Sequence, residues 1–176
     1  MLTRKIDNAL YESYSDDIPQ LLKKIYAARS VTESQLSMAL PGLLKPSFDQ
    51  LSIALDLLQN CIEEDRRILI VGDFDADGAT ASVVAIKALR LMGAKYVDFL
   101  VPNRFKHGYG LSPEIVNEAK LEKEPNLIIT VDNGISSNEG AALARSLGID
   151  VIITDHHLPP EELPDANAII NPNLRG

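Results

Sequence analysis

From residue 67 onward, short runs of apolar and β-branched residues alternate with segments of helical periodicity, and this alternation restricts the fold more than any other feature of the sequence. The expected strands are RILIVGD, YVDFLV, NLIITVD, DVIITD and NAII, at residues 67–73, 96–101, 126–132, 150–155 and 167–170. The expected helices between them cover residues 79–93, 112–121 and 136–148. Strands that are apolar on both faces are typical of a parallel sheet covered on both sides. The predicted fold class is therefore α/β, a parallel β-sheet with helices on both faces.

The first 65 residues follow a helical pattern without strands. Apolar residues recur at helical spacing over residues 18–30 and 48–62. Two pairs with capping-box spacing mark expected helix starts, namely Thr32 with Gln35 and Ser47 with Gln50. We therefore predict a small N-terminal helical layer over residues 1–65, packed against a second domain over residues 66–176.

Composition narrows the class of protein and its partners. A chain of 176 residues with 45% hydrophobic and 24% charged residues is typical of a soluble globular core of ordinary size. The start of the chain has no signal-peptide core, no apolar run is long enough to span a membrane, and the single Cys61 argues against a disulfide framework. We expect a cytoplasmic protein with no membrane partner. A net charge of −8 opposes sequence-independent binding to nucleic acid unless a metal offsets the acid.

Three of the expected strands end in residues that commonly bind metals. In chain order these residues are Asp73, Asp75 and Asp77, then Asp132, then Asp155, His156 and His157. Because ligands bind at the carboxyl ends of parallel strands, near the point where strand order reverses, we expect these side chains to lie together. If the loop after the first strand stays extended, its three aspartates point the same way. Crowded carboxylates need a cation, and a mixed Asp/His set suits manganese, magnesium with water, zinc or iron better than calcium.

The segment GDFDADG also resembles the start of an EF-hand calcium loop, but two features argue against that interpretation. The loop needs a bidentate Glu at its twelfth position, where this chain has Val84. The preceding residues ILIV form a β-branched run and not the end of an amphipathic helix.

The aspartates and histidines at the three strand ends could instead hold two ions. Two such ions can bind both the attacking and the leaving oxygen of a phosphoryl displacement, so metal-assisted phosphoester hydrolysis is the expected chemistry.

Four phrases, LIVGDFDADGAT, VPNRFKHGYGLSP, TVDNGISS and TDHHLP, together resemble the DHH phosphoesterase superfamily, which is named for the motif at residues 155–157. Within it the resemblance is to bacterial exonucleases that degrade single-stranded DNA from the 5′ end, and it extends from about Ile25 to Gly176. The resemblance implies a metal-dependent 5′ to 3′ exonuclease in DNA repair and recombination. It also implies single-stranded DNA as the partner and Mn²⁺ or Mg²⁺ as the cofactor, with two ions in the complete enzyme.

The resemblance also assigns roles to individual residues. The metal ligands that it implies are Asp75, Asp77, Asp132 and His156. Either Asp77 or Asp132 would bridge the two ions. His157 is placed among the catalytic residues, and together with Asp73 and Asp155 it is expected to orient the ligands or the attacking water.

Residues 102–110 and two glycines are the candidates for substrate binding. Arg104 offers a planar fork for a phosphate. Gly78 and Gly134 are expected to let the backbone approach the substrate. The neighbouring residues expected to form only a solvated turn are Phe105, Lys106 and Tyr109.

Other functions remain open at this point. A haloacid-dehalogenase-like phosphatase would use Asp73 as a covalent nucleophile, whereas other DHH enzymes hydrolyse small nucleotides or pyrophosphate. A non-catalytic metal- or nucleotide-binding module is the third alternative. The superfamily uses a further aspartate from a later motif, and after His157 the acidic residues are only Glu161, Glu162 and Asp165. We therefore expect a C-terminally incomplete DHH domain, partnered by missing C-terminal domains of the same enzyme and weakly active alone.

Overall fold

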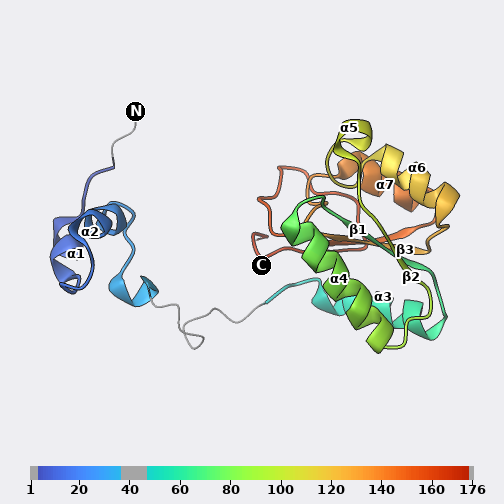
Figure 1. The fold of residues 1–176 in the computed structure, drawn as a ribbon, viewed down its shortest axis with the longest axis horizontal. Helices are drawn as coiled ribbons and strands as arrows, with labels where there is room; N and C mark the ends of the chain where they lie inside the picture. Colours follow the sequence, from blue (N-terminus) through green and yellow to red (C-terminus); the bar gives the residue numbers. More distant parts are fainter. Residues whose placement is uncertain (1–3, 37–46, 175–176) are drawn as a thin grey trace. The chain divides into compact units, whose positions relative to one another are not determined.

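The computed structural model describes residues 4–36 and 47–174. The chain divides into two compact units, Met1–Pro46 and Ser47–Gly176 (Figure 1). This division falls earlier than the change of sequence pattern near residue 65, because the helix at Leu51–Glu63 belongs to the second unit.

The first unit is a small group of helices. Its elements are α1 (Asn8–Ser13), α2 (Gln20–Ala27) and the 3₁₀ helix η1 (Glu33–Leu36). The buried Tyr14 donates its hydroxyl hydrogen to the carbonyl of Val31, which joins the segment after α1 to the segment after α2. The backbone N–H of Thr32 donates to Gln35 Oε1 at 2.7 Å, which is one half of the expected capping box, but the helix that follows is a short 3₁₀ helix.

The second unit contains a five-stranded sheet, and every expected strand is present. The strands are β1 (Ile68–Gly72), β2 (Val97–Leu100), β3 (Leu127–Val131), β4 (Asp150–Thr154) and β5 (Ala168–Ile170). The helices are α3 (Leu51–Glu63), α4 (Ala76–Leu91), α5 (Arg104–His107), α6 (Pro113–Glu122) and α7 (Asn138–Ser146). All strand pairs are parallel, in the order β2-β1-β3-β4-β5. The predicted α/β class is confirmed.

Helices cover both faces of this sheet, as the apolar strands require (Figure 1). Leu69 and Val71 of β1 pack into one cluster with apolar residues of α6 and α7. Ile68 and Ile70 point to the other face and pack into a second cluster with residues of α3 and α4. This alternation follows from the period of two in a strand. None of the helices within the described ranges is both long and apolar enough to cross a membrane.

The expectation that Ser47 and Gln50 start a helix is wrong. Helix α3 begins at Leu51, after a turn at residues 49–50, and Gln50 makes no capping bond. Its side chain instead accepts a hydrogen bond from the backbone N–H of Ile169 in β5 at 2.7 Å. Because this contact joins residues 119 positions apart, local spacing could not reveal it.

Strand order places β1 and β3 at the centre of the sheet. The chain passes from β1 to β2 on one side and then returns to β3 on the other side of β1. The reversal therefore lies between β1 and β3, where parallel sheets bind ligands. Residues that follow β1, β3 and β4 come together at this carboxyl-end edge.

Candidate active site

Two groups of potential metal ligands lie at the carboxyl ends of β1, β3 and β4. One group consists of Asp132, His156 and His157, and the other of Asp73, Asp75 and Asp132. Within each group, one ligand atom from every residue lies within 4.8 Å of the others. Asp132, which follows the central strand β3, is the member that both groups share. The structure thus brings together the three strand ends that the sequence predicted.

The loop after β1 does not stay extended, and this separates Asp77 from its neighbours. Helix α4 begins at Ala76, and Asp75 caps it by accepting hydrogen bonds from the N–H groups of Asp77 and Gly78, both at 3.0 Å. Asp77 therefore lies in the first helical turn and belongs to neither ligand group. It lines a cavity of 320 Å³ with Asp132 and His156.

Asp73 lies deeper than Asp75. It is 6% exposed, and its Oδ1 accepts a hydrogen bond from the backbone N–H of Phe74 at 2.7 Å. Asp73 belongs to the same ligand group as Asp75. It is therefore a candidate metal ligand itself, in addition to the orienting role that was expected of it.

Asp132 has an unusual backbone and an unfavourable electrostatic position. Its φ of 63° lies in the left-handed region, which few non-glycine residues adopt. Its Oδ1 lies 2.8 Å from His156 Nε2. Burial and the nearby charge of Asp75 raise the pKa of Asp132 in spite of this contact. A carboxylate held in this way is stabilised by a bound cation.

Asp155 points inward and organises the histidine loop. Its side chain is 1% exposed, and it accepts hydrogen bonds from the N–H groups of Ile135, His156 and His157. Its Oδ1 also lies 2.7 Å from His157 Nδ1. Burial acts to raise the pKa of Asp155, but these hydrogen bonds together lower it. The contact between Asp155 Oδ1 and His157 Nδ1 raises the pKa of His157. The arrangement fits the orienting role predicted for Asp155.

No lysine or arginine neutralises this edge of the sheet within the described ranges. Ion pairs of 4.0 Å or less from Asp132 and Asp155 go only to His156 and His157, and Asp73, Asp75 and Asp77 make none. Carboxylates and imidazoles that converge without a basic partner form a donor set that fits Mn²⁺, or Mg²⁺ with water.

Arg104 lies beside the ligand groups, at the start of α5. Its guanidinium carbon stands 4.7 Å from the centre of the Phe74 ring. It lines a cavity of 440 Å³ that Asp73, Asp75 and His157 also line. Phosphate binding by Arg104 stays a prediction.

Tyr109 was expected to be part of a solvated turn, but it lines the same cavity. Its ring meets His157 edge-on, with centroids 6.2 Å apart. Burial, and then the charges of nearby aspartates, raise the pKa of Tyr109 to about 12. Its position in the same loop as Arg104 was the only signal in the sequence. Phe105 is fully exposed and Lys106 pairs with Glu118 at 3.3 Å, as expected for a surface turn.

Both predicted substrate-binding glycines have a packing role. A Cβ on Gly78 would lie 2.5 Å from the backbone nitrogen of Asp73. Gly134 has a φ of 112°, and a Cβ there would lie 2.5 Å from Thr130 Oγ1. The N–H of Gly78 is already donated to Asp75. Close approach within the protein explains these glycines, and contact with substrate stays a prediction.

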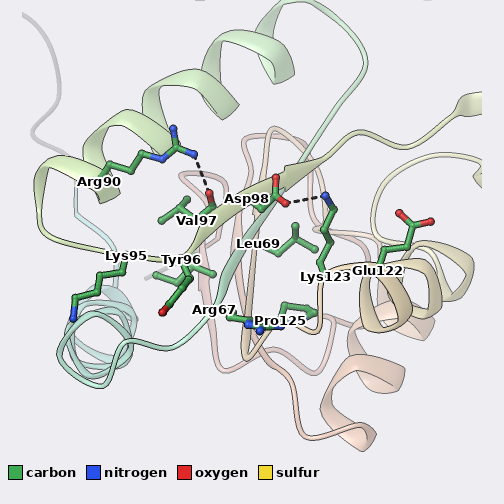
Figure 2. A pocket seen from close by; sticks show the side chains of 11 residues that line it. Arg67, Leu69, Arg90, Lys95, Tyr96, Val97, Asp98, Glu122, Lys123 and Pro125 are labelled. Atoms are coloured by element: carbon green, nitrogen blue, oxygen red, sulfur yellow. Dashed lines mark hydrogen bonds and ion pairs between the residues drawn. The ribbon is translucent and has the colours of Figure 1, made fainter.

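A third cavity, of 530 Å³, lies near the opposite edge of the sheet (Figure 2). Most of its charged side chains are occupied by contacts within the chain. Lys123 pairs with Asp98 at 2.8 Å, and Arg90 donates to the carbonyl of Val97 at 3.0 Å. The carboxyl-end edge is therefore the candidate site, although this third cavity has the larger volume.

The fold and the donor set define an α/β domain with a candidate divalent-metal site at the strand switch point. The model of the DHH family, N-terminal domain, matches residues 67–176, and the chain belongs to this family.

Similar proteins agree with the exonuclease resemblance. The chain is 52% identical over 163 residues to the single-stranded-DNA-specific exonuclease RecJ of Salmonella typhimurium, a match that covers 90% of this chain and 28% of that protein. The chain thus spans less than a third of the length of this relative.

Two solved structures share the fold. The crystal structure of exonuclease RecJ bound to manganese matches with a TM-score of 0.66 and 34% identity, covering 75% of this chain and 33% of that chain. RecJ from Thermus thermophilus in complex with Mn²⁺ matches with a TM-score of 0.63 and 27% identity, covering 94% of this chain and 24% of that chain. Both of these related proteins bind manganese in their solved structures. The two ligand groups of this chain are of a kind that fits a divalent cation.

Proposed function

We propose that this chain is the metal-binding part of an exonuclease that hydrolyses phosphodiester bonds of single-stranded DNA from the 5′ end. The observation that carries the proposal is the shared position of Asp132 in two groups of ligands. Divalent ions held by these residues would supply an activated water and would stabilise the charge of the scissile phosphate. Asp132, which both ligand groups share, would hold the ions in preference to Asp77.

The remaining residues hold the site in place. Asp75 and His156 are the other proposed ligands from the two groups, and Asp73 joins them because of its place in the second group. Asp77 is also proposed as a ligand, because it lines a cavity with Asp132 and His156. His156 contacts Asp132 and orients its carboxylate. Asp155 holds the ring of His157, so that the histidine loop keeps one conformation.

Arg104 is proposed to bind a phosphate of the DNA. Its guanidinium is free of ion pairs among the residues that the structure describes, and it borders the cavity next to Asp73 and Asp75. In Arg104→Ala, binding of 5′-phosphorylated single-stranded DNA should weaken by about 1.5–3 kcal/mol. The metal-induced rise in thermal stability should be unchanged. Equal DNA binding by the variant and the parent would return Arg104 to the solvated-turn interpretation.

The proposal extends to the setting of the enzyme. The RecJ relative is more than three times as long as the matched region. We propose that further domains, such as the rest of that relative supplies, complete the site and enclose the DNA strand. We therefore expect weak activity from the 176 residues alone. A cytoplasmic location and a role in DNA repair and recombination are part of the same proposal.

A chimaera tests the function directly. The matching region of Salmonella RecJ is replaced by this chain, and release of nucleotides from single-stranded DNA is measured with Mn²⁺. We expect digestion from the 5′ end, lost in the same chimaera with Asp75→Ala. Short oligonucleotides, cyclic dinucleotides and pyrophosphate are assayed in parallel. Preference for one of these over single-stranded DNA, or activity that survives Asp75→Ala, would contradict the proposal.

A further inference from the structure

Asn133 is fully buried and lies directly after the shared ligand Asp132. Its side-chain Nδ2 donates two hydrogen bonds, to the carbonyl of Val71 at 3.0 Å and to that of Val131 at 2.9 Å. Val71 belongs to β1 and Val131 to β3. One side chain therefore joins the carboxyl ends of the two central strands.

These two strand ends carry the ligands. Val71 precedes Asp73 by two residues, and Val131 directly precedes Asp132. The β1–β3 ladder ends with the pairing of Gly72 and Val131, so the ladder itself does not extend to the ligands. The amide of Asn133 continues the link between the strands at the point where regular pairing stops.

The backbone of Asp132 needs such support. Its φ of 63° is a conformation that a residue with a side chain adopts only when its surroundings hold it. On one side the N–H of Asp132 donates to the carbonyl of Thr154 in β4 at 3.1 Å. On the other side Asn133 is held by β1 and β3. The carboxylate of Asp132 is thereby presented to both ligand groups.

The oxygen of the same side chain shows that the amide nitrogen is the important group. Asn133 Oδ1 is buried and has no hydrogen-bond partner among the described residues. An unpaired buried oxygen is unfavourable. An apolar side chain of similar size would avoid that cost, so the contribution of this asparagine lies in the two bonds that it donates.

We propose that Asn133 is a positioning residue that sets the separation between the Asp73–Asp75 side of the site and Asp132. It touches neither metal nor substrate, and it acts through the two backbone carbonyls. The inference rests on the proposed function, because it assumes that these aspartates bind divalent ions.

The test measures Mn²⁺ binding to the whole chain by the EPR signal of free Mn²⁺, with unfolding by denaturant measured separately in the absence of metal. Asn133→Leu keeps the branching at Cγ and removes both donated bonds, and Asn133→Ala is the second variant should the larger leucine side chain not fit. Substitution of residues that orient ligands typically weakens metal binding about 10- to 100-fold, and we expect a loss of this size.

Asn167 provides the matched control at the other end of the sheet. Its Nδ2 donates to Asp150 Oδ1 at 2.9 Å, and its Oδ1 accepts from the N–H of Val151 at 2.8 Å. Asn167→Leu therefore removes two hydrogen bonds, as Asn133→Leu does, but these bonds go to β4. We expect it to lower stability while leaving the Mn²⁺ affinity at the level of the parent.

The outcomes separate the two proposals. Parent-like Mn²⁺ affinity in a folded Asn133 variant would overturn the positioning role and leave the metal site intact. An equal loss of affinity in Asn167→Leu would overturn it as well, because general loosening of the sheet would then be sufficient. Absence of Mn²⁺ binding by the parent would overturn the proposed function itself, and the positioning role with it.

Discussion

Acidic residues at the two edges of the sheet differ in their ionic partners. At the amino-end edge, Asp150 pairs with Arg66 at 2.7 Å and Asp98 pairs with Lys123 at 2.8 Å. At the carboxyl-end edge, Asp132 and Asp155 have only histidine as ionic partner, within the ranges that the structure describes. The first arrangement stabilises the fold. The second leaves negative charge uncompensated where a cation can bind.

The pKa directions show the same contrast. The contact with Lys123 lowers the pKa of Asp98, so its ionised form is favoured in the folded state. Burial and the charge of Asp75 raise the pKa of Asp132, so its ionised form is disfavoured until a cation arrives. Asp155 is the exception at the carboxyl-end edge, because hydrogen bonds from backbone N–H groups satisfy it.

The largest expected effect comes from removing the carboxylate of Asp155. Asp155→Ala leaves the buried N–H of Ile135 and those of the histidine loop without their acceptor. Since a hydrogen bond to a charged group contributes roughly 1.5–3 kcal/mol, the free energy of unfolding should fall by about 3 kcal/mol. Denaturant unfolding measures the loss. Asp165→Ala, in the same loop but exposed, is the control and should change it little. A loss below about 1 kcal/mol in Asp155→Ala would show that water replaces the carboxylate.

Metal addition should produce the next largest effect. A ligand at one hundred times its dissociation constant stabilises the fold by about 2.7 kcal/mol. For a chain of this size the melting temperature should rise by roughly 5–10 °C with Mn²⁺. Asp132→Asn removes the shared carboxylate and should abolish most of the rise, whereas Asp98→Asn, at the other edge, should retain it. An undiminished rise in Asp132→Asn would assign the metal to other residues.

Without metal, the two edges should respond with opposite signs. Asp132→Asn should raise stability at neutral pH, since it removes a disfavoured charge and asparagine tolerates a positive φ. Asp98→Asn should lower it by at most about 1 kcal/mol, because the pair with Lys123 is exposed. Unfolding experiments on metal-free protein compare both variants with the parent.

The pH dependence follows from the same directions. The folded-state pKa of Asp132 lies above the usual 3.8. The ionised carboxylate therefore lowers the free energy of unfolding at neutral pH, and this loss fades as the pH falls through the raised pKa. The pKa of Asp98 lies below 3.8, so its contribution persists to lower pH and is lost only below that value. The gain from Asp132→Asn should therefore disappear at a higher pH than the loss from Asp98→Asn. The reverse order would contradict the assigned directions.

The smallest expected effect is that of salt. At about 1 M salt the screening length is roughly 3 Å, so the loss in Asp98→Asn should vanish. The loss in Asp155→Ala should remain, because its carboxylate is only 1% exposed and is held by hydrogen bonds. The two variants are unfolded in parallel at low and high salt. Equal screening of both would show that Asp155 acts as a surface charge.

Strands and ligand types could be predicted because they depend on neighbouring residues. The runs at residues 68–72, 127–131 and 150–154 are apolar on both faces, and each ends directly before an aspartate. Parallel pairing then brings those aspartates to one edge, whatever the details of the loops. The conformation of the first loop also depends on neighbouring residues, since Asp75 caps the helix that starts at Ala76. The expected helix starts only at residue 79 and so leaves out this cap.

The sequence by itself determined the fold class, the edge of the sheet that carries the site, and the kinds of side chain that bind there, because periodicity and strand ends are local properties. Tertiary structure decided which residues share the site. It placed β3 at the centre, which makes Asp132 common to both ligand groups, and it turned Asp155 inward. It also brought Tyr109 into the cavity. These outcomes depend on strand order and on hydrogen bonds between residues distant in the chain, and local spacing contains no record of such contacts.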